Sequence, residues 1–367
     1  MWLTEKLVYI NTNMGCNMND VLIDHESLRK LCINIQIGYG ILEPDAKIVS
    51  DCLIEANLMG LDTHGIIRLK PYMDRIKAGG NNPLPNIRIV KDNLCTALLD
   101  ADNALGPVGG KQAMELAIKK AHSTGIGIVV IRNCNHYGPA GYYARMALAQ
   151  EMIGVSMTNV LASMPPTGGA EAYIGNNAYS IAFPTKDEPP VVVDGATSLA
   201  SWGKVFLCAQ EGKDLPDGCY VDSDGNLTVK PQDVINGGSL LPFAGHKGYG
   251  IAVAIELLTG MLADTSLDHD IPHPYKELAK PGMNTFFMSA IRLSDFINPE
   301  RFMIRMDVWI RSVRSIRKSE GVDRIWLPGE KEFVMRNQRL IDGVPLSSIM
   351  VNELRILAIE AGVMFNL

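Results

Sequence analysis

Short apolar runs separated by turn residues fill the middle of the chain. They occupy residues 126–132, 153–160, 178–184, 189–194 and 284–293, and further strands are expected between residues 87 and 102. Apolar runs of this length, bounded by glycine, proline and asparagine, are typical of strands rather than helices. The pattern therefore predicts a central sheet.

Both ends of the chain instead repeat their apolar residues every three or four positions, which is typical of helices. Helices are expected over residues 24–41, 43–60, 66–80 and 109–125, and again from residue 331 onwards. Asp24 or Ser27 suits the first N-cap, and Pro71 must bend the third helix or lie near its start. The almost wholly apolar stretch 246–262 predicts a helix buried on all sides.

Because helices bracket a mixed α/β centre, we expect the two ends of the chain to pack together. About twenty residues before the first helix are expected to form an irregular extension. The chain has 367 residues and 47% hydrophobic residues, enough for one large or two ordinary domains.

Charge and cysteine content narrow the class of protein. The formal net charge is −6 and no long basic run occurs, which argues against nucleic-acid binding. The longest apolar run contains Glu256 and is too short to span a membrane. Seven cysteines form no close pair, and no signal-peptide pattern is visible. We therefore expect a cytoplasmic protein with reduced thiols and no membrane partner.

His136 is the first candidate for chemistry, because it lies between a predicted strand and a predicted helix start. The positive end of the helix dipole disfavours imidazolium, so the ring is expected to be neutral and able to accept a proton. A turn histidine with only local hydrogen bonds is the alternative, and for an isolated histidine it is the more common case.

His64 and Arg68 are four residues apart, so on a helix they would share a face, which Tyr72 would continue. A guanidinium binds a planar carboxylate through two parallel hydrogen bonds. The alternative is a solvated arginine on an amphipathic helix.

Three glycines, Gly245, Gly248 and Gly250, surround Lys247 at the start of the apolar helix. Glycines let a ligand approach the backbone, and helix starts attract anions, so Lys247 is a candidate for a phosphate, ribose or carboxylate contact. We expect this lysine to be held near the core; a tight structural turn is the alternative.

Asp194, at the end of an apolar strand, and the amides of Asn176 and Asn177 are weaker candidates for ligand contacts. Other patterns are rejected: no GxGxxG follows a strand, so a classical Rossmann fold is not expected. His269 and His273 have the spacing of metal ligands, but Pro272 lies between them, so no metal site is expected.

Six motifs in order, DTHGIIRL, NHYGPAGYYA, PPTGGAEAYIGNNAYSIAFP, VVVDGATSLASWGK, GHKGYG and LPGE, resemble the non-Rossmann malate/L-lactate dehydrogenase family, which includes sulfolactate, ureidoglycolate and diketogulonate enzymes. The resemblance covers residues 24–362. It implies an α/β (α+β) fold with a mixed, largely antiparallel sheet, surrounding helices and a helical domain from both chain ends. Residues 1–90 and 331–367 would form the helical domain, and residues 91–330 the cofactor-binding domain.

The resemblance also implies hydride transfer between NAD or NADP and a small 2-hydroxy acid, in a homodimer and without a metal. By position, His136 would be the catalytic proton acceptor, and Lys247 would assist catalysis or fix the cofactor. Substrate contacts would come from His64, Arg68, Tyr72 and Asn177. Cofactor contacts would come from Val160, Asp194, Gly195, Ala196, Lys247, Pro328, Gly329 and Glu330.

The chain departs from the family pattern near the cofactor. Val160 replaces a residue that often carries a hydroxyl, and Gly175-Asn176-Asn177-Ala178 replaces Gly-Thr-Asn-Pro. These changes leave NAD against NADP open. The NHYGPAGYYA motif favours malate and oxaloacetate; the alternatives are lactate, sulfolactate or ureidoglycolate, a cyclic 2-imino acid reductase, or a binding protein without activity.

Overall fold

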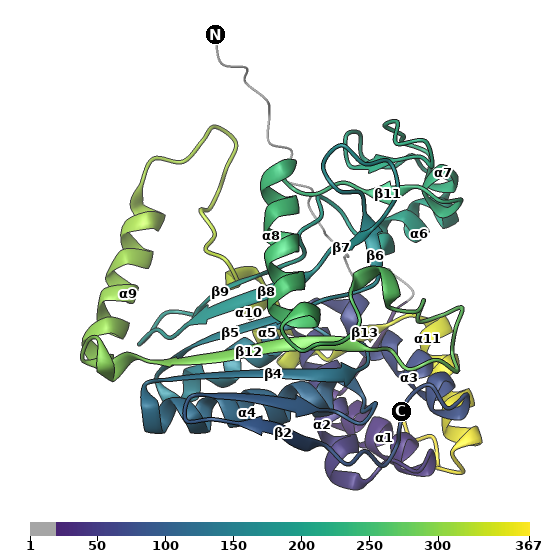
Figure 1. Cartoon of the computed structure of the whole chain (residues 1–367), viewed down its shortest axis with the longest axis horizontal. Coiled ribbons are helices and arrows are strands. Elements are labelled where there is room, and N and C mark those ends of the chain that lie inside the picture. Colours follow the sequence, from purple (N-terminus) through teal and green to yellow (C-terminus); the bar gives the residue numbers. More distant parts are fainter. Residues whose placement is uncertain (1–19) are drawn as a thin grey trace.

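The centre of the computed structural model, which describes residues 20–367, is a seven-stranded sheet with the order β2-β3-β4-β12-β5-β8-β9 (Figure 1). Its strands are β2 Arg88–Asp92, β3 Thr96–Asp100, β4 Ile126–Cys134, β5 Met152–Thr158, β8 Ala178–Phe183, β9 Val191–Gly195 and β12 Asn284–Arg292. Only β3 and β4 pair in parallel; the other neighbours in this sheet are antiparallel. The mixed, largely antiparallel sheet confirms the expected fold class.

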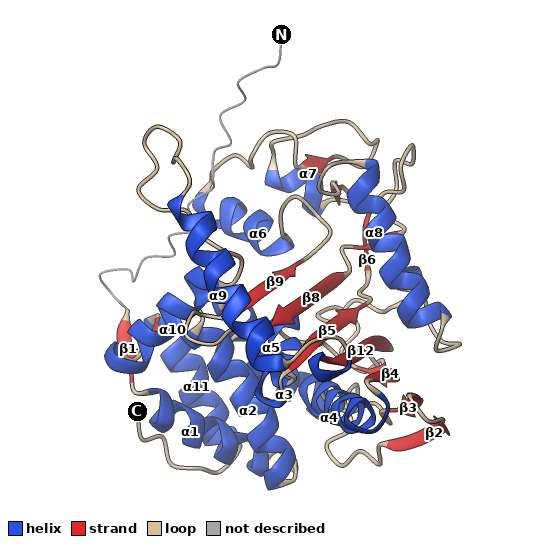
Figure 2. Cartoon of the chain, turned by 90° about the vertical axis from the view of Figure 1, so that its left-hand side faces the viewer, coloured by secondary structure: helices blue, strands red, loops and turns tan. Residues whose placement is uncertain are grey.

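Helices α4 (Gly106–Thr124) and α5 (Ala140–Met146) pack on one face of this sheet. Their buried side chains, such as Met114 and Tyr143, form a core with Phe286 of β12. Helix α8 (His246–Glu256) and the π-helical turn Leu257–Met261 contact the sheet from the other face (Figures 1 and 2).

Both ends of the described chain contribute to one helical cluster, as predicted. Its elements are α1 His25–Gly38, α2 Glu43–Leu58, α3 Leu69–Lys77, α10 Glu330–Asp342 and α11 Ser348–Glu360. Strand β1 (Val21–Ile23) pairs antiparallel with β13 (Val344–Leu346), which joins the two ends directly. Asp24 is the N-cap of α1, because its carboxylate accepts from the Ser27 amide at 2.8 Å.

A smaller unit with its own core lies between β5 and β12 in the chain. It contains β6 Ala162–Met164, β7 Ile174–Gly175, α6 Trp202–Glu211, β10 Tyr220–Val221, α7 Pro231–Ile235 and β11 Ser239–Leu240. Val205, Tyr220 and Leu240 are fully buried in it. The sequence pattern did not predict α6 or α7, nor α9 (Pro299–Ser315), whose Ile310 packs against Val191 and Leu327.

Two expectations about helices are wrong. Residues 62–68 form two 3₁₀ turns, Asp62–His64 and Ile66–Arg68, and the α-helix begins only at Leu69, so Pro71 lies in its first turn. The apolar helix α8 is not buried on all sides: Ile251 is 39% exposed, and Leu262, just beyond it, is 57% exposed. Within residues 20–367, only one side of this helix is packed against other elements.

The extension expected at residues 1–19 lies outside the described residues. Within residues 20–367, no helix is long and apolar enough to cross a membrane. The six cysteines of this part of the chain carry no disulfide.

Candidate active site

His136 lies in the turn between β4 and α5, as predicted. Its Nδ1 atom is 2.7 Å from the hydroxyl of Tyr72, and its ring stacks with that of His64 at 5.8 Å between centroids. Burial, and then the charges of Arg68 and His64, hold the pKa of His136 well below its usual value. The ring is therefore neutral, and burial rather than the helix dipole is the main cause. Helix α5 begins four positions later, at Ala140.

Close packing of the backbone fixes this turn. A side chain at Gly106 would come within 1.9 Å of the His136 carbonyl oxygen, so the start of α4 can approach only as glycine. Asn135 is buried, and its amide donates to the carbonyl oxygens of Asn103 and Ala104, both at 2.9 Å. His136 is thus held by neighbours on both sides.

Arg68 lies close enough to raise the electrostatic cost of protonating both histidines. Its Nε donates to the Thr63 carbonyl oxygen at 2.6 Å, and its Nη1 contacts the hydroxyl of Tyr275. Burial, followed by the charge of Arg68, lowers the pKa of His64 to about 4. The site therefore has one cation beside two neutral imidazoles, which suits a substrate with a carboxylate.

Burial raises the pKa of Tyr72, so its hydroxyl stays protonated beside His136. Four residues expected from the sequence, His64, Arg68, Tyr72 and His136, are thus brought together in one cluster. Tyr275 was not predicted, because it lies in an irregular proline-bounded stretch without periodicity.

Asn177 lies in a different network. Its side chain is fully buried, donates to the Ala252 carbonyl oxygen at 3.0 Å and to Asp268 at 2.9 Å, and accepts from the Val160 amide at 3.0 Å. These contacts hold the segments of Val160 and Asn177 together, and none of them joins Asn177 to the His136 cluster.

The segments expected to contact the cofactor converge around β9. The Val192 amide donates to the Pro328 carbonyl oxygen at 3.0 Å, and the Phe243 amide, just before the Lys247 turn, donates to the Thr197 carbonyl oxygen at 3.0 Å. Residues 194–196, 245–247 and 328–330 come from three distant parts of the chain, so their approach to β9 and to the segment directly after it was not visible in the sequence.

Asp194 connects these segments to the His136 turn. Its carboxylate accepts from the Gly141 amide of α5 at 2.8 Å. Although the residue as a whole is exposed, desolvation of the carboxyl group, partly offset by this hydrogen bond, raises its pKa to about 6. Gly195, beside it, has open space where a side chain would lie.

Lys247 and Glu330 differ in their availability to a ligand. The Lys247 side chain is exposed in the first turn of α8, so the expectation that it is held near the core is wrong. Glu330 is buried, and its carboxylate is already paired with Arg314, at 2.9 Å, and with Arg324. A role for Glu330 through its side chain would have to act through these ion pairs.

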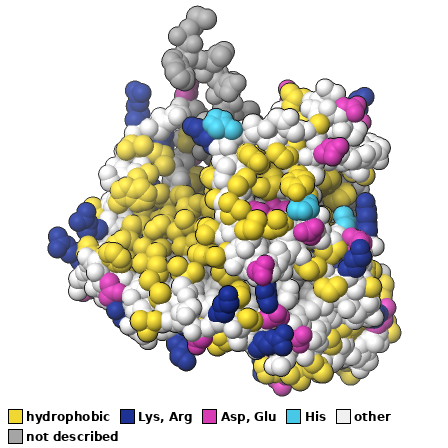
Figure 3. Space-filling view, viewed as in Figure 1, with side chains coloured by type: hydrophobic (Ala, Val, Ile, Leu, Met, Phe, Trp, Pro, Cys, Tyr) yellow, Lys and Arg dark blue, Asp and Glu magenta, His cyan; other side chains and the backbone are white. Residues whose placement is uncertain are grey.

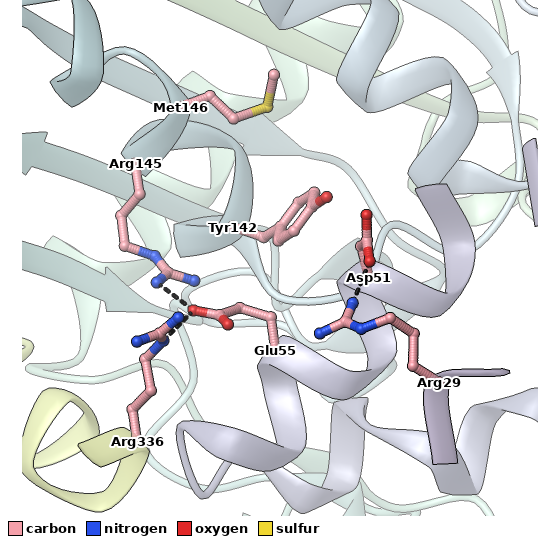
Figure 4. Close-up of a pocket in the computed structure, with 7 residues that line it drawn as sticks. All are labelled: Arg29, Asp51, Glu55, Tyr142, Arg145, Met146 and Arg336. Carbon is pink, nitrogen blue, oxygen red and sulfur yellow. Dashed lines mark hydrogen bonds and ion pairs between the residues drawn. The ribbon is translucent and has the colours of Figure 1, made fainter. Parts of the chain in front are cut away.

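A polar pocket of about 330 Å³ beside α5 contains none of the residues expected to bind substrate or cofactor (Figure 4). In it, Glu55 of α2 accepts from Arg145 of α5 and Arg336 of α10, both at 2.9 Å. Arg29 and Asp51 form a second ion pair there. The two Glu55 pairs connect α2 to α5, which follows the His136 turn, and to α10, which begins at Glu330.

The chain resembles known proteins along almost its whole length. The sequence profile described as malate/L-lactate dehydrogenase matches residues 23–355. The malate dehydrogenase of Pyrococcus horikoshii is 41% identical over 354 residues, covering 94% of this chain and 97% of that protein. The L-sulfolactate dehydrogenase of Methanocaldococcus jannaschii is 37% identical and covers 93% of this chain and 98% of that protein.

Solved structures of malate dehydrogenases have the same fold as this chain. The Pyrococcus horikoshii malate dehydrogenase superposes with a TM-score of 0.88 at 38% identity, over 96% of this chain and 99% of that one. A malate dehydrogenase from Entamoeba histolytica superposes with a TM-score of 0.90 at 30% identity, over 95% of this chain and 100% of that one. Sequence and fold together show that the chain belongs to the malate/L-lactate dehydrogenase family of oxidoreductases.

Proposed function

We propose that this protein oxidises malate to oxaloacetate, and carries out the reverse reduction, with a nicotinamide cofactor. The observation that carries the proposal is the neutral His136, hydrogen-bonded to Tyr72 and adjacent to Arg68. A 2-hydroxy acid needs both features: a cation for its carboxylate and a base for the hydroxyl at C2.

The two ring nitrogens of His136 have different roles: one contacts Tyr72, and the other exchanges a proton with the substrate. Nδ1 faces Tyr72, and Nε2 has no hydrogen bond to residues 20–367. In oxidation, Nε2 accepts the proton of the substrate hydroxyl. This role uses the tautomer in which Nδ1 keeps its hydrogen and donates a hydrogen bond to the Tyr72 oxygen. In reduction, the imidazolium returns the Nε2 proton to the carbonyl oxygen. Tyr72 is a neutral acceptor, so unlike a carboxylate it does not raise the pKa of the histidine strongly.

We place the cofactor at the segments around β9. Asp194, the open space at Gly195 and the exposed side chain of Lys247 offer a carboxylate, an approachable backbone and a cation on neighbouring segments. When bound, the nicotinamide supplies the acceptor or donor of the hydride. Asp194 and Lys247 bind and orient it, and the Gly141–Asp194 hydrogen bond positions this region relative to His136.

We expect Tyr72→Phe to lower kcat about fivefold in both directions, because the net worth of one such hydrogen bond is about 1 kcal/mol. The lost hydroxyl leaves the Nδ1 proton without its acceptor and the ring free to change orientation. Steady-state rates check this, and cofactor affinity should not change. A variant with parental kcat would show that Tyr72 does not orient His136.

We expect Lys247→Ala to weaken cofactor binding about tenfold without unfolding the protein, since a charge-assisted hydrogen bond is lost. Fluorescence titration with NADH and with NADPH measures this and also reveals the preferred nucleotide. Lys230→Ala, which removes another exposed lysine of the smaller unit, is the control. Superimposable titrations for Lys247→Ala and the parent would assign the glycine-rich turn a structural role only.

A steady-state assay of oxaloacetate, sulfopyruvate and pyruvate with each reduced cofactor tests the reaction itself. Sulfopyruvate is included because a relative named L-sulfolactate dehydrogenase is 37% identical. The highest kcat/KM is expected with oxaloacetate. A higher value with sulfopyruvate would make sulfolactate the substrate, and no oxidation of cofactor with any keto acid would refute the proposal.

We also propose that two copies of the chain associate through the face that carries α8 and α9. Figure 3 shows apolar surface spreading over this face. More than a third of the surface is exposed at Ile251, Leu257, Leu258, Met261 and Leu262 near α8, and at Ile304, Val308 and Trp309 on α9. A contiguous apolar patch is typical of an interface, and a second copy of the chain is the occupant that the family resemblance implies.

We expect the parent to sediment as a dimer and the double variant Leu262→Glu/Trp309→Glu as a monomer, because the new carboxylates would be buried unpaired in the interface. Ile341→Glu is the matched control, since Ile341 is 84% exposed on α10. A parent that sediments as a monomer would contradict this arrangement.

A further inference from the structure

The irregular segment between the π-helical turn and β12 approaches the site with one side chain, that of Tyr275. Its hydroxyl contacts Nη1 of Arg68, although the two residues are 207 positions apart in the chain. Tyr275 is also close enough to Tyr72 to influence its pKa electrostatically. Yet the residue is 47% exposed, so burial in a core does not explain where it lies.

A dedicated turn holds Tyr275 in this place. The His273 ring accepts hydrogen bonds from the backbone amides of Tyr275 and Lys276, both at 3.2 Å. Glu277 closes the same turn, because its carboxylate accepts from the His273 amide at 2.9 Å. The direction of the tyrosine is therefore set by its own turn.

Arg75 fastens this turn to the catalytic region. It is 5% exposed, and its guanidinium donates to the carbonyl oxygens of Pro274, at 3.3 Å, and Lys280, at 2.6 Å. It also donates to the side chain of Asn135 at 3.2 Å. Arg75 lies one turn after Tyr72 on α3, and Asn135 directly precedes His136. The same group thus holds the Tyr275 turn and the surroundings of the proton acceptor.

The chemistry of the contact suggests what the hydroxyl does. A tyrosine hydroxyl both accepts and donates. Its oxygen accepts from Arg68, and its own proton has no described acceptor within residues 20–367, so it is available to a ligand beside the guanidinium. A carboxylate bound there would meet donors from both groups.

We propose that Tyr275 is a substrate-binding residue whose hydroxyl donates a hydrogen bond to the same carboxylate that Arg68 binds. This inference rests on the proposed function, because it assumes a 2-keto or 2-hydroxy acid at Arg68. In the complex, the Tyr275 hydroxyl and the Arg68 guanidinium both donate hydrogen bonds to the substrate carboxylate. In the free enzyme, the hydroxyl contacts Arg68. Tyr275 takes no part in proton transfer, which belongs to His136.

The test is Tyr275→Phe, which removes one oxygen atom and keeps the ring. We expect KM for oxaloacetate and the inhibition constant of oxamate, an unreactive 2-keto acid mimic, both to rise about tenfold, because one hydrogen bond to a charged group is lost. We expect kcat to stay within about twofold. Tyr39→Phe is the control, since its hydroxyl also donates to a charged group, Glu360, but in the helical cluster.

A double-variant cycle with Arg68→Lys asks whether the two residues act on one carboxylate. The combined rise in the oxamate constant should be smaller than the product of the single rises. An unchanged constant in Tyr275→Phe, a lower one, or strictly multiplicative effects would each overturn the proposal. A lower constant would mean that Tyr275 competes with the substrate for Arg68. Failure of the proposed function would instead appear as a parent inactive with every keto acid.

Discussion

Replacing His136 by asparagine should lower kcat by about 100- to 10,000-fold in both directions, which is the usual worth of a positioned proton transfer. Asparagine is similar in volume and retains a donor, so the fold and the cofactor affinity should survive. The expected loss is large because Tyr72 holds Nδ1 of His136, which leaves Nε2 to exchange a proton with the substrate.

The expected dependence of the rate on pH differs between the two directions of the reaction. Burial holds the pKa of His136 well below the usual histidine value of about 6.5, so the neutral form prevails in the free enzyme at pH 7. Oxidation needs that form; its kcat/KM should be level around neutrality and fall only in acid, as the ring is protonated. Reduction needs imidazolium and should decline as pH rises through the pKa.

Rates measured against pH in both directions, for the parent and His136→Asn, check these statements. The variant should lose the histidine limb from both profiles. If it keeps that limb with only a small loss of rate, the proton goes to another group, and His64 becomes the better candidate.

Arg68→Lys should raise KM for the keto acid by about 30-fold, which corresponds to about 2 kcal/mol for the loss of a charge-assisted contact. Lysine keeps the charge but not the planar, two-pronged geometry. All three donors of a lysine lie on one nitrogen, whereas Arg68 uses Nε for the Thr63 carbonyl oxygen and has its Nη atoms for the substrate.

Titration with reduced cofactor separates this effect from a general one, because the cofactor affinity of Arg68→Lys should equal that of the parent. Lys70→Arg, which lies beyond the 3₁₀ turn and pairs with Asp74 at 2.6 Å, is a control for charge substitution on α3. An unchanged KM in a folded Arg68→Lys protein would remove Arg68 from the substrate site.

Local sequence was sufficient for most of the central sheet and for the first helices. Apolar runs between turn residues gave the strands, and the Asp24 cap and Pro71 marked helix starts correctly, because these preferences act over a few residues. The ordered motifs also identified the family, and with it His64, Arg68, Tyr72 and His136. The helices of the smaller unit and α9 were not predicted, because their apolar and polar residues follow mixed patterns.

Contacts between distant residues were decided only by the tertiary structure. An apolar helix such as α8 has the same pattern whether it faces a core or an exposed face, so sequence could not predict the exposure of Ile251. Likewise, the pKa of His136 is set by burial and by Arg68 rather than by the nearby helix start, and the contact of Tyr275 with Arg68 spans 207 positions. Sequence determined which residue types were available for the chemistry, and packing determined which of them meet, because burial and long-range contacts arise only when the whole chain is folded.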